Sequence, residues 1–348
     1  AALLKQINMP APQRLLFLLV LLFNPLYFHL SFSYMTDVPF CALCIIAVYY
    51  YWKMLQEDHW KWWLLATLFS ILAILIRQLG LLLPLAFGAA YFWQARSWSR
   101  FARALIAVFL TFGSLQLYLW ILHVTVGLPK TFVSVSSIFG RLSWNFLSHA
   151  ANNYGGRFLY YMVLFILSVL SLSRFLRWTR ASLILQSICL LLLSYFAYSY
   201  WPNPYLQNII YNLGLGPITL PGPAASNLAQ MQCLSQDFLL VIKVVVTVFL
   251  FSLSYFLAIG LRHIWKHALH LSPRSAMRFG SLLFTLAYGL YLLIDYHKFD
   301  RYLLPLLPMV LLLFPTIKVA WRSYRLGLAG LMVLLISFFS VAGTHDYL

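Results

Sequence analysis

Long apolar segments alternate with short polar or charged breaks along most of the chain. A transmembrane helix needs about 20 mostly apolar residues, and fewer where neighbouring helices thin or bend the bilayer. The pattern therefore predicts an all-α polytopic membrane protein with about 11 transmembrane helices. They are expected near residues 15–32, 39–55, 62–76, 78–94, 104–123, 158–173, 181–200, 238–259, 279–295, 302–317 and 326–342.

Composition excludes a water-soluble globular protein. Of the 348 residues, 63% are hydrophobic and only 9% are charged, whereas soluble domains are usually about half apolar and a quarter charged. The net charge of +17 would suggest a nucleic-acid partner in a soluble protein. In a membrane protein Lys and Arg instead collect on cytoplasmic loops, so we expect membrane lipids as partners and no nucleic acid.

The distribution of positive charge predicts the orientation. With the N-terminus inside, the cytoplasmic connections carry 17 of the 24 Lys and Arg residues, and the outer connections carry six. This asymmetry follows the positive-inside rule. It is strong because the outer connections carry fewer positive charges even though they include the two longest ones, 124–157 and 201–237.

No internal repeat or linker divides the chain, so we expect a single transmembrane domain over residues 1–348. The Pro- and Gly-rich segment 201–236 predicts an irregular loop over the outer mouth. Cys41 and Cys44 lie inside an apolar span, where packed sulfur is the simplest interpretation. No cluster of metal-ligand residues stands out, so we expect neither a metal nor another cofactor.

The first candidate site lies where one predicted helix ends and the next begins. Asp37 follows Tyr34 closely and precedes Pro39, which suits the first turn of a helix. Thr36 or Asp37 can simply cap that helix. Alternatively, a carboxylate at the outer mouth accepts a proton from an acceptor hydroxyl. The two roles are compatible.

The second candidate site is Arg77-Gln78, between two short apolar helices. An arginine at this depth is costly unless it meets an anion or a carboxylate. It can snorkel toward the interface, or grip a phosphate with two parallel N–H bonds, which the adjoining polar Gln78 favours.

The third candidate site surrounds the start of the predicted helix 302–317 and holds Lys298, Asp300, Arg301 and Tyr302. Asp300 can pair with Arg301 or cap the helix. The alternative is a cationic surface for a phosphate.

Three motifs follow one another along the outer side: Tyr34-Met35-Thr36-Asp37-Val38-Pro39-Phe40, then Ile76-Arg77-Gln78, then Asp300-Arg301-Tyr302-Leu303-Leu304-Pro305. In order and sidedness they resemble the GT-C membrane glycosyltransferases. The motifs are similar to those of bacterial members of the superfamily that holds protein O-mannosyltransferases and lipid A aminoarabinose transferases. Dolichyl-phosphate-glucose glucosyltransferases are similar in order.

The resemblance implies transfer of a sugar from a polyprenyl-phosphate donor to a glycan, lipid or protein acceptor at the outer membrane face. Asp37 matches an acidic position of the family and is the expected catalytic residue. Arg77 matches a basic position that faces the donor phosphate. We expect Gln78 and Arg301 to join it, with Asp300, Tyr302, Tyr34 and Lys298 as further site residues.

The resemblance also implies an N-terminal truncation. Family members have two more helices before the stretch that Asp37 occupies, and the first outer loop between them bears an acidic residue commonly assigned as the catalytic base. The chain starts after that point, so we expect a fragment without that loop. The expected location is a bacterial inner membrane, with the active site facing outward in the cell envelope.

Two other functions compete with transfer. A transporter or flippase of a lipid-linked or anionic solute would show repeats and midplane charges, but only Lys243 clearly lies within a span. A non-catalytic scaffold would not require Asp37, Arg77, Asp300 and Arg301 all at one face.

Overall fold

The computed structural model describes residues 2–6, 9–32, 35–127, 272–294 and 300–313, with isolated positions between 184 and 191 and between 330 and 341. All regular elements in these ranges are helices. The predicted spans 158–173, 181–200, 238–259 and 326–342 lie wholly or mostly outside the described residues. The total of about 11 transmembrane helices therefore stays a prediction.

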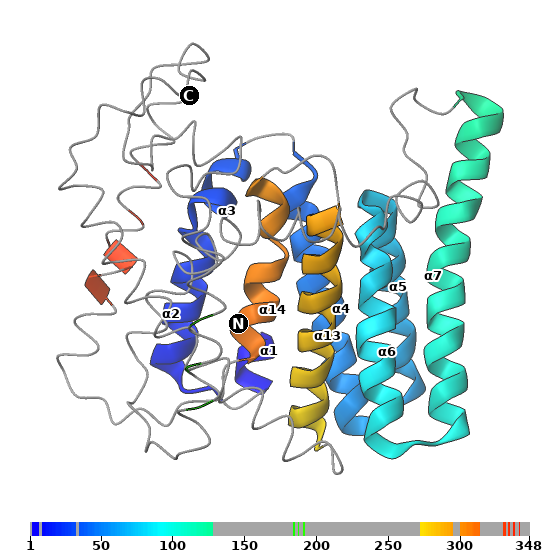
Figure 1. The fold of residues 1–348 in the computed structure, drawn as a ribbon, viewed down its shortest axis with the longest axis horizontal. Coiled ribbons are helices and arrows are strands. Elements are labelled where there is room, and N and C mark those ends of the chain that lie inside the picture. The colour runs from blue at the N-terminus through cyan, green and yellow to red at the C-terminus, as the bar shows by residue number, and fades with distance from the viewer. Residues whose placement is uncertain are drawn as a thin grey trace.

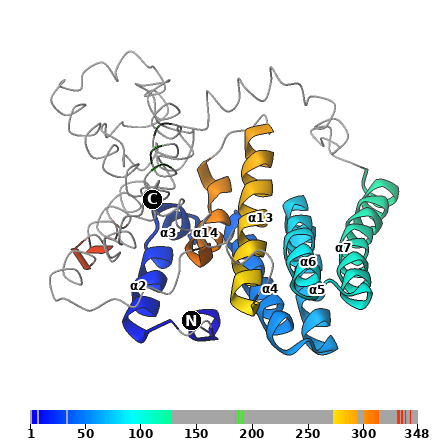
Figure 2. The ribbon, with the colours of Figure 1, turned by 60° about the horizontal axis from the view of Figure 1, so that its bottom comes forward.

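The fold is organised around a row of helices that stand side by side in both views (Figures 1 and 2). Successive helices α4, α5, α6 and α7 alternate in direction, and α13 packs against α6 and α4. Next to α13 lies α14. Their bounds are α4 Asp37–Glu57, α5 Trp60–Ile76, α6 Leu82–Ala95, α7 Trp98–Thr125, α13 Pro273–Ile294 and α14 Leu306–Leu313.

Two of these helices are long and apolar enough to cross a membrane by length and composition, α4 and α7. With 21 residues, α4 extends about 30 Å, which matches the hydrocarbon thickness of a bilayer.

Three predicted spans are interrupted. The span 15–32 divides into α2 (Ala11–Leu22) and α3 (Pro25–Leu30), with the short α1 (Ala2–Gln6) before them. The break occurs because Asn24 Oδ1 accepts the Leu26 N–H at 3.0 Å and caps a new helix that begins at Pro25. The prediction of a single helix over residues 15–32 was therefore wrong.

The other two interruptions are 3₁₀ turns at helix starts. The predicted span 78–94 begins with η1 (Gln78–Leu81), and 302–317 begins with η4 (Asp300–Leu303). α14 starts only after Pro305, which has no N–H for a helical hydrogen bond.

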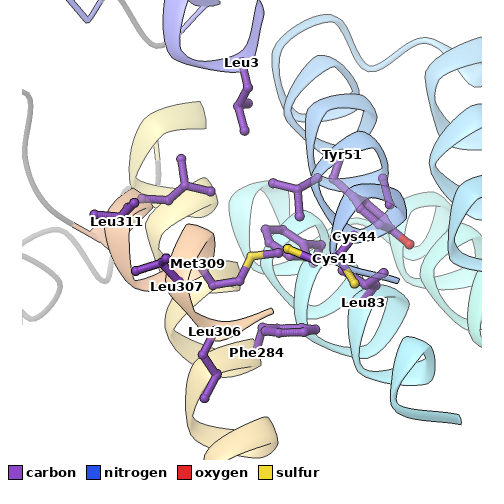
Figure 3. Packing of buried hydrophobic residues seen from close by; sticks show 14 of the residues in the cluster. Leu3, Cys41, Cys44, Tyr51, Leu83, Phe284, Leu306, Leu307, Met309 and Leu311 are labelled. Atoms are coloured by element: carbon purple, nitrogen blue, oxygen red, sulfur yellow. The ribbon is translucent and has the colours of Figure 1, made fainter. Parts of the chain in front are cut away.

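The core lies where α4, α13 and α14 meet. Cys41 and Cys44 are fully buried free thiols of α4, and Figure 3 shows them in one packed layer with Phe284 of α13 and Met309 of α14. A Cβ on Gly280 would lie 2.6 Å from Cδ1 of Phe87, so this glycine allows α13 to approach α6 closely.

A polar network joins the ends of α4, α6 and α7 at the predicted cytoplasmic side. Asp58 Oδ2 accepts hydrogen bonds from Arg100 at 2.8 and 3.1 Å. Asp58 Oδ1 accepts from Arg103 at 3.0 Å and from the Tyr91 hydroxyl. Burial alone would raise the pKa of Asp58, but the bonds from Tyr91 and Arg100 and the charges of Arg100 and Arg103 outweigh it and lower that pKa.

We predict that Asp58→Asn lowers the thermal unfolding midpoint at pH 7 by about 2 °C, since screening limits a partly exposed pair to about 1 kcal/mol. The folded-state pKa lies below the ordinary 3.8, so this stabilisation is present above that pH and is lost as the pH falls through the folded-state value. Thermal unfolding of wild type and variant at pH 7 and pH 3 measures the difference, which should be smaller at pH 3 than at pH 7.

Glu57→Gln is the control, because it removes a neighbouring exposed carboxylate that pairs with Lys53 one turn earlier in α4, while its amide oxygen can still accept the hydrogen bond from the Trp62 indole N–H. Its effect should be smaller than that of Asp58→Asn. An Asp58→Asn midpoint equal to wild type at pH 7 would contradict a stabilising role for the network.

Candidate functional site

The candidate site is centred on an ion pair between Asp37 and Arg77 at the predicted outer ends of α4 and α5. Nη2 of Arg77 lies 2.7 Å from Oδ1 of Asp37. The Asp37 side chain is 1% exposed and that of Arg77 is 19% exposed. Because an unpaired charge at this depth is costly, each residue stabilises the charged form of the other.

Helix geometry favours both charges. Asp37 is the first residue of α4, where the N-terminal end of the helix dipole stabilises a carboxylate. Arg77 follows the last residue of α5, where the C-terminal end stabilises a cation. Thr36 occupies the N-cap position of α4 without a side-chain capping bond.

The turn after α5 positions Arg77. Arg77 takes an extended conformation with φ −144° and ψ 131°, which ends α5. Its carbonyl accepts the Gly80 N–H at 2.9 Å and so closes η1. Gly80 lies so close to α5 that an added Cβ would be 2.4 Å from the backbone nitrogen of Ile74. Only a glycine allows this approach.

Tyr302 of η4 completes the described part of the site. Its ring lies 4.8 Å from Cζ of Arg77, a cation–π distance. The structure thus brings together one residue from each of the three predicted sites. Gln78 is half-buried at the start of η1.

Other predicted site residues fall outside the described part. Tyr34 and Lys298 are not among the described residues, and the side chains of Asp300 and Arg301 are likewise outside the description, although their backbone forms the start of η4. Their roles stay predictions.

The guanidinium of Arg77 has hydrogen-bond donors that the ion pair with Asp37 does not use. An arginine carries five N–H groups, and Nε of Arg77 is buried without a hydrogen-bond acceptor among the described residues. The pairing with buried Asp37 does not fit a side chain that simply snorkels to the interface. Within the described ranges, no three His, Cys, Asp or Glu side chains come together as metal ligands would.

Reasoning from the sequence missed Tyr288 of α13. It is fully buried, and its electrostatic neighbours include Arg77 and Asp37. With 22 tyrosines in the chain, nothing local distinguished it, because its place depends on how α13 packs against α4.

Residues 8–120 match the family described as dolichyl-phosphate-mannose-protein mannosyltransferase. This match confirms the resemblance to the GT-C membrane glycosyltransferases. The matched region contains Asp37, Arg77 and helices α4 to α6. Searches of curated proteins and of solved structures gave no match. Together with the apolar helices, the family match supports an integral membrane protein with glycosyltransferase activity.

We predict that Gly80→Ala lowers the free energy of unfolding by about 1–3 kcal/mol, because the added methyl group forces η1 away from the backbone of α5. The shift also moves Arg77 relative to Asp37. Thermal unfolding of the purified protein in detergent measures the loss.

Gly113→Ala in α7 is the matched control, since a Cβ there meets nothing within 4 Å. That substitution should leave stability equal or raise it by up to about 1 kcal/mol. Equal stability of Gly80→Ala and wild type would show that the close approach does not hold the turn in place.

Proposed function

We propose that the protein transfers a sugar from a polyprenyl-phosphate donor to an acceptor on the extracytoplasmic side of the membrane. The observation that carries the proposal is the buried Asp37–Arg77 pair, within the region that matches the mannosyltransferase family. The donor lipid, the side of the membrane and the roles of the two residues are inferred from the chemistry that such a transfer requires.

The physical demands of such a donor fit this site. A polyprenyl phosphate keeps its tail in lipid and its charge at the interface, so the protein must supply a cation at headgroup level. Arg77 supplies one between two apolar helices, and its unused Nε–H suits a phosphate oxygen. Arg301 and Lys298 are the further cations that we expect there.

The proposed reaction is a direct displacement at the anomeric carbon. An oxygen of the acceptor hydroxyl forms the new bond to that carbon while the bond from the carbon to the phosphate oxygen breaks. Asp37 orients the hydroxyl and accepts its proton, and the polyprenyl phosphate departs with the electron pair of the broken bond. Arg77 stabilises the charge that grows on the departing phosphate.

The distribution of charge supports the proposed sidedness. Lys53, Arg96, Arg100 and Arg103 all lie at the ends of α4, α6 and α7 that are far from Asp37. The positive-inside rule assigns that end to the cytoplasm. Asp37 and Arg77 then face the extracytoplasmic side, where the acceptor is expected.

We predict that Arg77→Ala and Asp37→Asn each lower sugar transfer about 100-fold or more, and that Arg77→Lys retains more activity than Arg77→Ala. Lysine keeps the charge but loses the two-pronged geometry that an arginine offers to a phosphate. The measurement uses the full-length protein in membranes with radiolabelled polyprenyl-phosphate sugars.

Removal of one partner from a buried pair destabilises a protein by about 3–5 kcal/mol, so the amount of folded protein must be measured alongside transfer. Asp37→Glu keeps the ion pair's charge but moves the carboxylate, and it should fold yet transfer slowly. Wild-type activity in all four variants would overturn the proposal. Labelled lipid that changes leaflet without sugar transfer would favour a flippase instead.

A further inference from the structure

Tyr288 of α13 carries a buried hydroxyl group that has no role in the mechanism proposed above. Its side chain is 0% exposed, and its ring stacks on Phe284 one helical turn earlier, with centroids 5.5 Å apart. Its hydroxyl has no hydrogen-bond partner among the described residues. A buried hydroxyl without a partner is less favourable than the bare ring of a phenylalanine in the same place.

The surroundings of Tyr288 are those of the candidate site. α13 packs against α4, and the electrostatic neighbours of the phenol are Arg77, Asp37 and the thiols of Cys41 and Cys44. Figure 3 shows Cys41, Cys44 and Phe284 in one layer between these two helices. Tyr288 therefore lies within electrostatic range of the ion pair, on a helix that packs against α4 and that none of the three sequence motifs contains.

Charge explains why a neutral donor is useful here. Asp37 and Arg77 together carry no net charge, so the pair alone does not neutralise an incoming anion. A phenol donates a hydrogen bond to a phosphate oxygen without repelling the neighbouring guanidinium. A hydrogen bond to a charged group in a site that excludes water is strong.

We propose that the Tyr288 hydroxyl is a binding group for the phosphate of the lipid donor, beside Arg77. This inference rests on the proposed function, because that function identifies the anion as a prenyl phosphate. The hydroxyl donates to a phosphate oxygen in both the bound donor and the departing lipid phosphate. No covalent bond to the tyrosine forms.

The test compares Tyr288→Phe with wild type in the full-length protein purified in detergent. Binding of a prenyl phosphate should weaken about tenfold or more, while binding of the corresponding prenol, which lacks the phosphate, should not change. The thermal unfolding midpoint of the unliganded variant should equal or exceed that of wild type, because the substitution removes only the unsatisfied hydroxyl.

Tyr51→Phe is the matched control. Tyr51 is also buried, but its hydroxyl bonds to Ser70 at 3.2 Å. Its removal should lower the unfolding midpoint and leave prenyl phosphate binding unchanged. Prenyl phosphate should raise the thermal unfolding midpoint of the wild-type protein, and inorganic phosphate should not raise it equally. An equal rise with inorganic phosphate would overturn the assignment of a lipid as the ligand.

Equal affinities of Tyr288→Phe and wild type for prenyl phosphate would overturn the inference. It would also be overturned if Tyr288→Phe weakened the binding of prenol as much as the binding of prenyl phosphate. Sugar transfer by wild type separates the two proposals. Transfer with normal phosphate binding by Tyr288→Phe leaves the proposed function intact and refutes the role of Tyr288. Weakened phosphate binding by Tyr288→Phe without transfer by wild type supports Tyr288 and refutes the transferase.

Discussion

The ion pair between Asp37 and Arg77 is the constraint on which the site depends. Neither charge is tolerable alone between apolar helices, so the start of α4 and the end of α5 must meet. At 2.7 Å the two side chains satisfy that demand, and each also lies at the helix end whose dipole favours it. Gly80 then allows η1 to turn tightly enough to present Arg77 to Asp37.

Two other features of the described fold surround this pair: the packing of α13, and a polar network at the opposite ends of the helices. α13 approaches α6 closely at Gly280, and its Tyr288 lies within electrostatic range of Arg77. At the opposite end, Asp58 ties Arg100 and Arg103 to the turn between α4 and α5. One end of the helix row thus carries structural charge pairs, and the other carries a pair with an unused buried donor, the Nε–H of Arg77.

Hydrophobic patterning was enough to predict α4, α5 and α6 within about four residues, whereas α7 and α13 each begin six residues before the predicted spans. The apolar run 62–76 corresponds to α5, and 39–55 corresponds to α4, because the length of an apolar segment decides whether it can span a bilayer. Patterning missed the break at Asn24, although an Asn followed by Pro is a recognisable helix start. The apolar residues around it concealed that signal.

The site was predictable only in part. Two helices joined by a short turn return to the same side, so the sequence placed Asp37 and Arg77 at one face, and Tyr302 followed from the order of the motifs. The approach of Tyr288 was not predictable, because α13 is far from α4 in the chain and its packing depends on shape. The family match covers residues 8–120 and so does not reach α13.

The most direct test of the account is an experimental structure of the full-length protein in a lipid nanodisc with a non-transferable prenyl-phosphate sugar. The account predicts a phosphate oxygen within about 3 Å of a guanidinium nitrogen of Arg77, with the anomeric carbon on the Asp37 side. A phosphate bound elsewhere, with the Asp37–Arg77 pair closed and untouched, would contradict it.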